Sequence, residues 1–154
     1  MTSTYLSIAI WMLAVGPMLE AAACEVSVPG ANGLPEWMAV SPEGFIWVGS
    51  PKLAAHVPED GHWPAMGPEH NYFDKWWWWR EGYRALDDPE PELVITATRL
   101  DASSAPVSVA DATSAMFTGR DLMLAGMAFP SSGCWEVIGR YRDEKLRFVF
   151  NVGY

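Results

Sequence analysis

All three histidines of the chain, His56, His62 and His70, lie within one short segment that also contains acidic residues. Neutral imidazoles with a carboxylate can hold zinc or copper. The spacing of the three matches neither one face of a helix nor a zinc motif, and prolines and glycines between them indicate a loop. We therefore expect polar loop residues here, with a zinc or copper site as the alternative.

Four consecutive tryptophans occupy positions 76–79. In a strand they alternate, so one pair enters the core while Trp77 and Trp79 face the other way. We expect the loop that contains Trp63 to cover this second pair. In the alternative the pair is exposed and stacks on a sugar ring or a partner protein, because a large exposed apolar patch usually marks a binding site. The candidate binding residues are Trp63, Trp77, Trp79, Arg80 and Tyr83.

Evidence for catalysis is weak. The chain has no G-x-S-x-G motif, and Ser131 and Ser132 have no histidine near them in sequence. The acidic residues between 87 and 92 alternate with prolines and are typical of a solvated linker, and Asp101 is expected to pair with an arginine at a turn. We expect a binding or structural module without a cofactor. The alternative is a metal-binding envelope protein or a small secreted hydrolase that uses the loop of His56, His62 and His70.

Composition excludes several partners. The 154 residues include 10 Lys and Arg against 19 Asp and Glu, for a formal net charge of −9. This balance argues against nucleic acid and against anionic lipid surfaces, which both require a basic patch. Half of the residues are hydrophobic and nine are Trp, so the chain has ample material for a folded core.

The first residues are typical of an export signal. Positions 5–19 form an apolar run that is too short to span a bilayer comfortably, and three alanines at 21–23 match a cleavage site. We expect a signal peptide at 1–23, one domain at 24–154, no membrane span after cleavage, and a secreted, periplasmic or envelope location. A glycan or an envelope protein is then the expected partner.

Two cysteines, Cys24 and Cys134, allow three states in an exported chain. We expect a disulfide between them. Cys24 also directly follows the alanines, where a lipoprotein would carry its lipid anchor. Two free thiols are the third alternative.

Strand signals dominate the rest of the chain, because 12 Pro and 13 Gly interrupt nearly every window long enough for a helix. Only two short helices, at 51–56 and 110–116, are candidates. Short strands at regular spacing indicate an all-β, immunoglobulin-like antiparallel β-sandwich of about seven strands. Trp135 takes the place of the tyrosine that pins a corner in such sandwiches. The expected strands are 24–28, 37–40 paired with 45–48, 93–100, 107–109, 122–129, 134–141 and 146–152.

Three segments carry a resemblance to a known family. They read KWWWWREGY at 75–83, RLDASSAP at 99–106 and FPSSGCWEVIGRY at 129–141. Together they resemble a family of small exported bacterial proteins of unknown function, which has a Trp-rich K-x-W-W-W-R-x-G-Y stretch and a C-terminal F-P-x-x-G-C-W-E-V-x-G-R motif. The middle segment has fewer prolines than that family typically shows. The resemblance covers residues 60–152 and implies bacterial export and a β-sandwich, but no particular chemistry.

Overall fold

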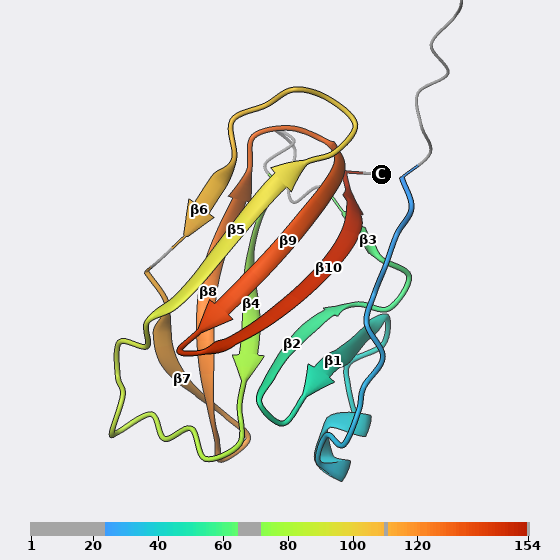
Figure 1. The fold of residues 1–154 in the computed structure, drawn as a ribbon. Helices are drawn as coiled ribbons and strands as arrows, with labels where there is room; N and C mark the ends of the chain where they lie inside the picture. Colours follow the sequence, from blue (N-terminus) through green and yellow to red (C-terminus); the bar gives the residue numbers. More distant parts are fainter. Residues whose placement is uncertain (1–23, 65–71, 110, 154) are drawn as a thin grey trace, which may run out of the picture.

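Two five-stranded sheets face each other in the computed structural model, which describes residues 24–64, 72–109 and 111–153 (Figure 1). The expected export signal at 1–23 lies outside these residues. The sheets do not close into a barrel, and the prediction of an all-β sandwich is confirmed. Among the described residues, no helix is long and apolar enough to cross a membrane.

The first sheet has the strand order β1-β2-β4-β8-β7, and every neighbouring pair is antiparallel. Its central strand β4 contains the four tryptophans. Its strands are β1 (Phe45–Ser50), β2 (Leu53–Pro58), β4 (Tyr72–Trp79), β7 (Thr113–Phe117) and β8 (Arg120–Phe129).

The second sheet has the order β3-β10-β9-β5-β6, in which only the short β3 runs parallel to its neighbour. The turn that joins β9 to β10 contains Arg142 at a φ of 56°. The strands of this sheet are β3 (His62–Trp63), β5 (Leu93–Arg99), β6 (Val107–Val109), β9 (Gly133–Tyr141) and β10 (Glu144–Val152).

Several local expectations were wrong. The segment 51–56 leads into β2 and the segment 110–116 into β7, where we expected short helices. Both become strands because neighbouring strands supply backbone partners, which overrides weak local propensity. The segment Glu36–Ala39 is a 3-10 helix, η1, rather than the expected strand. The described residues contain ten strands, against about seven expected.

Indole rings fill the space between the two sheets. Trp76 and Trp78 on β4 are fully buried there and contact Phe148, while Trp135 enters the core from β9. A Cβ atom built on Gly139 of β9 would lie 2.2 Å from the ring of Trp78. The absence of a side chain at Gly139 therefore lets the Trp78 ring lie against the opposite sheet.

Trp135 closes the corner before β9, as expected. Its indole N–H donates a hydrogen bond to the backbone oxygen of Ser131 at 3.2 Å. Arg99 spans the same corner by pairing with Asp101 at 2.7 Å and donating to the Ser131 hydroxyl at 2.9 Å. The predicted Asp–Arg turn pair is therefore present, and it supports the entry to β9.

The N-terminal segment is fastened to the second sheet at two points. A disulfide joins Cys24 to Cys134 at the start of β9, which is the first of the three expected states. In this state the Cys24 sulfur cannot also carry a lipid through a thioether. Ser27 then pairs with Val149 of β10, an isolated bridge where a strand at 24–28 was expected. From there the segment runs along the sandwich to η1 (Figure 1).

Replacing Gly139 by Ala should lower the free energy of unfolding by about 1–3 kcal/mol, because the new methyl group overlaps the Trp78 ring and forces strain into the core. Chemical denaturation measured by tryptophan fluorescence tests this. The matched control is Gly30→Ala, where a Cβ meets nothing within 4 Å. Equal stability of the two variants would contradict the packing described here.

Replacing Cys24 and Cys134 together by Ser should cost about 2–5 kcal/mol, because the bridge closes a loop with a sequence separation of 110 residues. Denaturation of the oxidised protein and of this double variant measures the difference. Reducing agent should destabilise the wild type and leave the variant unchanged. A wild type that is insensitive to reductant would show that the bridge contributes nothing.

Candidate functional site

The outer face of the first sheet carries a second, smaller aromatic cluster. Alternation along β4 turns Trp77 and Trp79 to this face, opposite to the buried Trp76 and Trp78. Trp47 of β1 points the same way, and Leu122 and Ala54 complete the sheet side of the cluster. The predicted second pair of tryptophans is thus only partly buried.

The cover over this cluster comes from η1 and the residues just before it. Trp37 contacts Trp47 and Trp79 edge to face, with ring centroids 5.8 and 6.0 Å apart. Leu34 and Met38 pack beside them. We expected the loop with Trp63 to form this cover, and that was wrong. Trp63 instead stacks against Trp76 inside the main core at 4.5 Å.

The cover leaves part of the outer face open as a cleft of about 490 Å³. The Trp77 ring lies in it beside the half-exposed Phe117 of β7, with ring centroids 5.5 Å apart. The volume falls within the range of about 300–1,000 Å³ found for ligand sites, which are lined mostly by apolar and aromatic groups. The lining residues are Trp37, Val40, Pro42, Trp47, His56, Trp77, Phe117, Thr118, Arg120 and Leu122.

Three polar side chains face this cleft. Arg120 lies over the ring of Trp37, with its guanidinium carbon 4.4 Å from the centroid. Thr118 contributes a hydroxyl group. His56 lies between Phe45 and Trp47 at 5.3 and 5.1 Å, and burial lowers the pKa of its imidazole below the usual value. His56 is therefore neutral at pH 7, and Arg120 is the charged group of the lining.

The structure divides the predicted binding residues among three places. Trp77 lines the cleft, and Trp79 lies next to it under Trp37. Trp63 belongs to the main core and is 1% exposed. Arg80 and Tyr83 lie together at a different corner, described below.

Sequence reasoning missed Trp37, Trp47, Phe117 and Arg120. The alternation of residues 45–50 and 113–117 was the available signal, since it places Trp47 and Phe117 on one face once both segments are known to be strands. The position of Trp37 had no such signal, because it depends on where the N-terminal segment crosses the sheet.

The predicted metal site is not assembled among the residues that can be placed. His56 lies on the outer face of β2, whereas His62 is exposed and bonds to Asp60 in its own turn. His70 lies outside the described residues. Over the part of the chain that the structure describes, no group of three potential metal ligands occurs.

Arg80 and Tyr83 belong to a corner organised by Asp88. The Tyr83 hydroxyl donates to the Asp88 backbone oxygen at 2.8 Å, and the Tyr141 hydroxyl donates to the Asp88 carboxylate. Arg80 and Arg142 both lie over the Tyr141 ring, at 5.8 and 5.2 Å. Because each polar group here already has a partner, the corner joins the 80–88 segment to β9.

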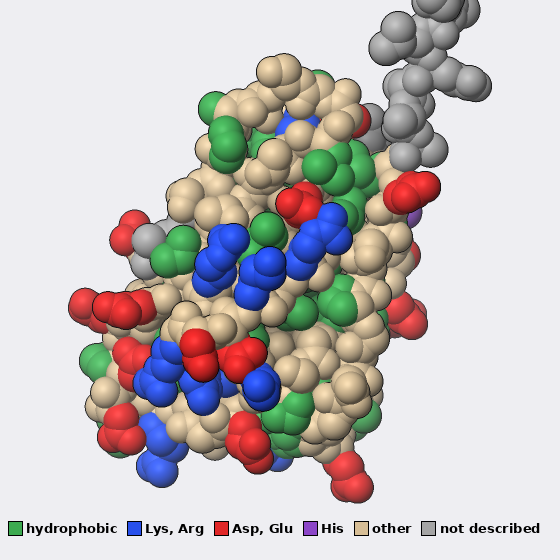
Figure 2. All heavy atoms as spheres, viewed as in Figure 1, with side chains coloured by type: hydrophobic (Ala, Val, Ile, Leu, Met, Phe, Trp, Pro, Cys, Tyr) green, Lys and Arg blue, Asp and Glu red, His purple; other side chains and the backbone are tan. Residues whose placement is uncertain are grey.

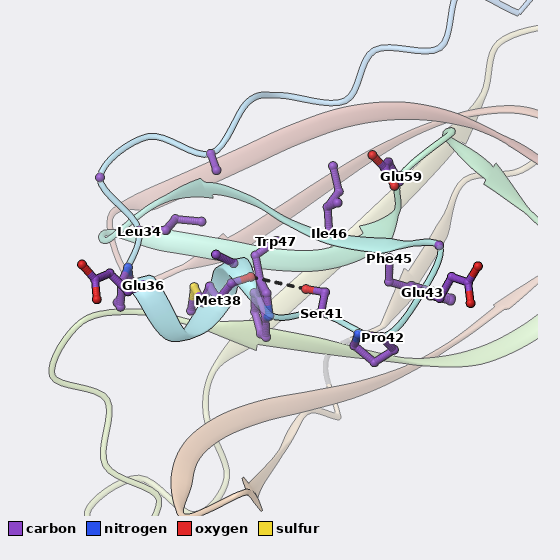
Figure 3. Close-up of a pocket in the computed structure, with 15 residues that line it drawn as sticks. Leu34, Glu36, Met38, Ser41, Pro42, Glu43, Phe45, Ile46, Trp47 and Glu59 are labelled. Carbon is purple, nitrogen blue, oxygen red and sulfur yellow. Dashed lines mark hydrogen bonds between the residues drawn. The ribbon is translucent and has the colours of Figure 1, made fainter.

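A second hollow lies between the N-terminal segment and β1, with a volume of about 620 Å³ (Figure 3). Its carboxylates do not converge, since Glu36 lies at one end and Glu43 and Glu59 lie at the other (Figure 3). Met38 and Trp47 form its floor and belong to the outer aromatic cluster. This hollow lacks the convergent polar groups of a ligand site.

The outer face of the second sheet is different in character. Lys and Arg side chains gather over β9 and β10 in Figure 2. Arg147 pairs with Glu136, and Arg140 donates to the Thr96 hydroxyl at 3.4 Å. This is a solvated polar face, so the aromatic side chains of the outer surface are concentrated on the opposite sheet.

Comparison of the chain with protein-family models, with curated proteins and with solved structures finds no match.

The Asp88 corner should make stability depend on pH in the alkaline range. Burial, followed by the Asp88 charge, raises the pKa of Tyr83 to about 12, and burial with the Asp88 bond also raises that of Tyr141. Unfolded tyrosines lose their protons near pH 10, so the folded state binds more protons above that pH. The free energy of unfolding should therefore be unaffected below about pH 9 and fall as the pH rises from about 10 towards 12.

Denaturation at a series of alkaline pH values measures this effect, and ultraviolet absorbance follows tyrosinate formation directly. Tyr83→Phe should remove part of the slope while leaving a smaller one from Tyr141. A wild type whose stability stays flat across this range would show that the two hydroxyls do not retain their protons.

Proposed function

We propose that this protein is an exported, non-catalytic binding module that captures a glycan in the aromatic cleft of its first sheet. The observation that carries the proposal is the cleft itself: Trp77 and Phe117 form a half-open platform flanked by polar groups from Arg120 and Thr118. A sugar ring has an apolar C–H face and a polar rim, and this lining offers a surface for each.

The shape of the site favours a ligand over a broad protein interface. Stable protein–protein interfaces bury on the order of 1,600 Å² and are built around a patch rather than a pocket. Here the exposed aromatic area is concave, and η1 bounds it on one side. A protein partner remains the second candidate, and the exposed Met116 and Phe117 on the edge strand β7 are the observation in its favour.

The chemistry of the lining supports capture rather than hydrolysis. Glycoside hydrolysis generally uses a pair of carboxylic acids on either side of the scissile bond. Within the described part of the chain, the lining contains no Asp, Glu, Ser or Cys. The site therefore offers stacking surfaces and hydrogen-bond donors without the acid and base that bond cleavage requires.

An immunoglobulin-like topology is part of this proposal. The order β2-β4-β8-β7 against β10-β9-β5-β6 corresponds to the A-B-E-D and G-F-C-C′ sheets of immunoglobulin variable domains, and β3 beside β10 adds a short parallel strand at the edge. The Trp135 bond to Ser131 supports the same assignment, since it takes the role of the tyrosine corner. On this assignment β1 and η1 are additions that build the cleft.

Export is the remaining part of the proposal. Disulfides persist in oxidising compartments, so the Cys24–Cys134 bridge supports a location outside the cytoplasm. The apolar run at 5–19 and the alanines at 21–23 support it independently. Glycans of the bacterial envelope would be within reach of such a protein.

Replacing Phe117 by Ala should weaken glycan binding by about tenfold, because stacking of an aromatic ring contributes on the order of 1 kcal/mol beyond its buried area. Cellohexaose, chitohexaose, oligogalacturonates and peptidoglycan fragments are suitable probes, and calorimetry with tryptophan fluorescence is the measurement. Binding should shift the fluorescence to shorter wavelength, because Trp77 loses contact with water.

Met116→Ala is the matched control, since Met116 is exposed on the same strand but alternates to the other side. It should bind as the wild type does. Equal losses of glycan binding in both variants would contradict the assignment of Phe117 to the binding surface. Absence of binding to every probe would refute the glycan proposal.

A further inference from the structure

We propose that the cleft selects sugars that carry a carboxylate, and that the Arg120 guanidinium is the group that recognises it. This inference rests on the proposed function and names its ligand class. The juxtaposition that carries it is one cation, with no acidic partner, beside the aromatic platform of Trp77 and Phe117.

Arg120 makes no ion pair among the residues that the structure describes. The neighbouring carboxylate, Asp121, points to the other side of β8 and pairs with Arg84 at 3.4 Å. The Arg120 guanidinium carbon lies over the Trp37 ring, 4.4 Å from its centroid. The five N–H donors of this group form a planar fork.

The orientation of this group suits a carboxylate. A guanidinium presents its donors as a rigid fork that matches two carboxylate oxygens at once, and the contact with the Trp37 ring restrains the Arg120 side chain before the ligand arrives. Less conformational entropy is then lost on binding. A lysine at this position would offer a point charge without the fork.

The charge of the cleft is opposite to that of the molecule as a whole. The chain carries 19 acidic residues against 10 basic ones. Among the residues that the structure describes, no acidic residue lines the cleft, and His56, whose pKa is lowered by burial, adds no charge at pH 7. Asp121, the carboxylate next to Arg120 in the chain, is paired with Arg84, so the charge of the lining favours an anionic ligand.

Uronic acids carry such a carboxylate on the ring itself, and muramic acid carries one on a lactyl ether. Arg120 would bind the carboxylate in both uronic acids and muramic acid, but the position of the carboxylate relative to the sugar ring differs between them. Trigalacturonate and the disaccharide of N-acetylglucosamine and N-acetylmuramic acid are therefore tested separately. Their uncharged counterparts are the methyl ester of trigalacturonate and chitobiose.

Calorimetry on the oxidised full domain measures each affinity. The wild type should bind at least one acidic probe about tenfold more tightly than its uncharged counterpart, as expected for one charge-assisted bidentate contact. Arg120→Gln should abolish this preference, so that the acidic probe and its uncharged counterpart bind with equal affinity. Arg120→Lys should restore only part of the preference, because it returns the charge without the fork.

The control is Lys145→Gln, which changes net charge by the same amount on the exposed outer side of the other sheet. It should keep the full preference. Equal binding of charged and uncharged probes by the wild type would overturn this inference while leaving glycan capture intact. A preference that survives Arg120→Gln would overturn it in the same way, whereas no binding to either kind of probe would overturn both proposals.

Discussion

The structure depends on fitting two indole rings into the space between two sheets. Trp76 and Trp78 both point inward from β4, and packed sheets lie only about 10 Å apart. The ring of Trp78 reaches the opposite sheet where Gly139 lacks a side chain. Phe148 of β10 packs against both indoles. A larger residue at position 139 would force apart the sheets, so this contact sets their spacing.

The inward direction of Trp76 and Trp78 determines which side chains lie on the outer face of the first sheet. Strand periodicity forces Trp77 and Trp79 outward if their neighbours point inward, because side chains alternate along a strand. Leaving two indoles fully in water would forgo the stabilisation that burial of a large aromatic ring gives. The N-terminal segment partly solves this by placing Trp37 and Met38 over the pair. Its path is held by the Cys24–Cys134 bridge and the pairing of Ser27 with Val149.

Local pattern was enough to predict several of the strands that build the core. The alternation of residues 93–99 and 146–152, the disulfide and the role of Trp135 could be read from residue type and spacing. Residues 51–56 were misjudged because Pro51 is a common helix start, whereas pairing with β1 and β4 decides their conformation. Of the predicted binding residues only Trp77 lines the cleft, and His56, considered as a loop residue or metal ligand, lines it as well. The rest of the cleft comes from β1, β7, β8 and η1 with the turns beside them, whose meeting depends on tertiary pairing rather than on any local signal.

The cleft is open because its cover is short, and this distinguishes it from the main core. The Trp37 ring packs edge to face against Trp79, and the Arg120 guanidinium lies over the same ring. One indole therefore covers part of the aromatic cluster and also contacts the cation of the cleft. Phe117, on an edge strand, stays 49% exposed. A chain selected for stability alone would gain from burying this ring. Its exposure beside a guanidinium that has no acidic partner among the described residues places an aromatic surface and a positive charge in one cleft. The same few residues therefore complete the fold on one side and line the cleft on the other.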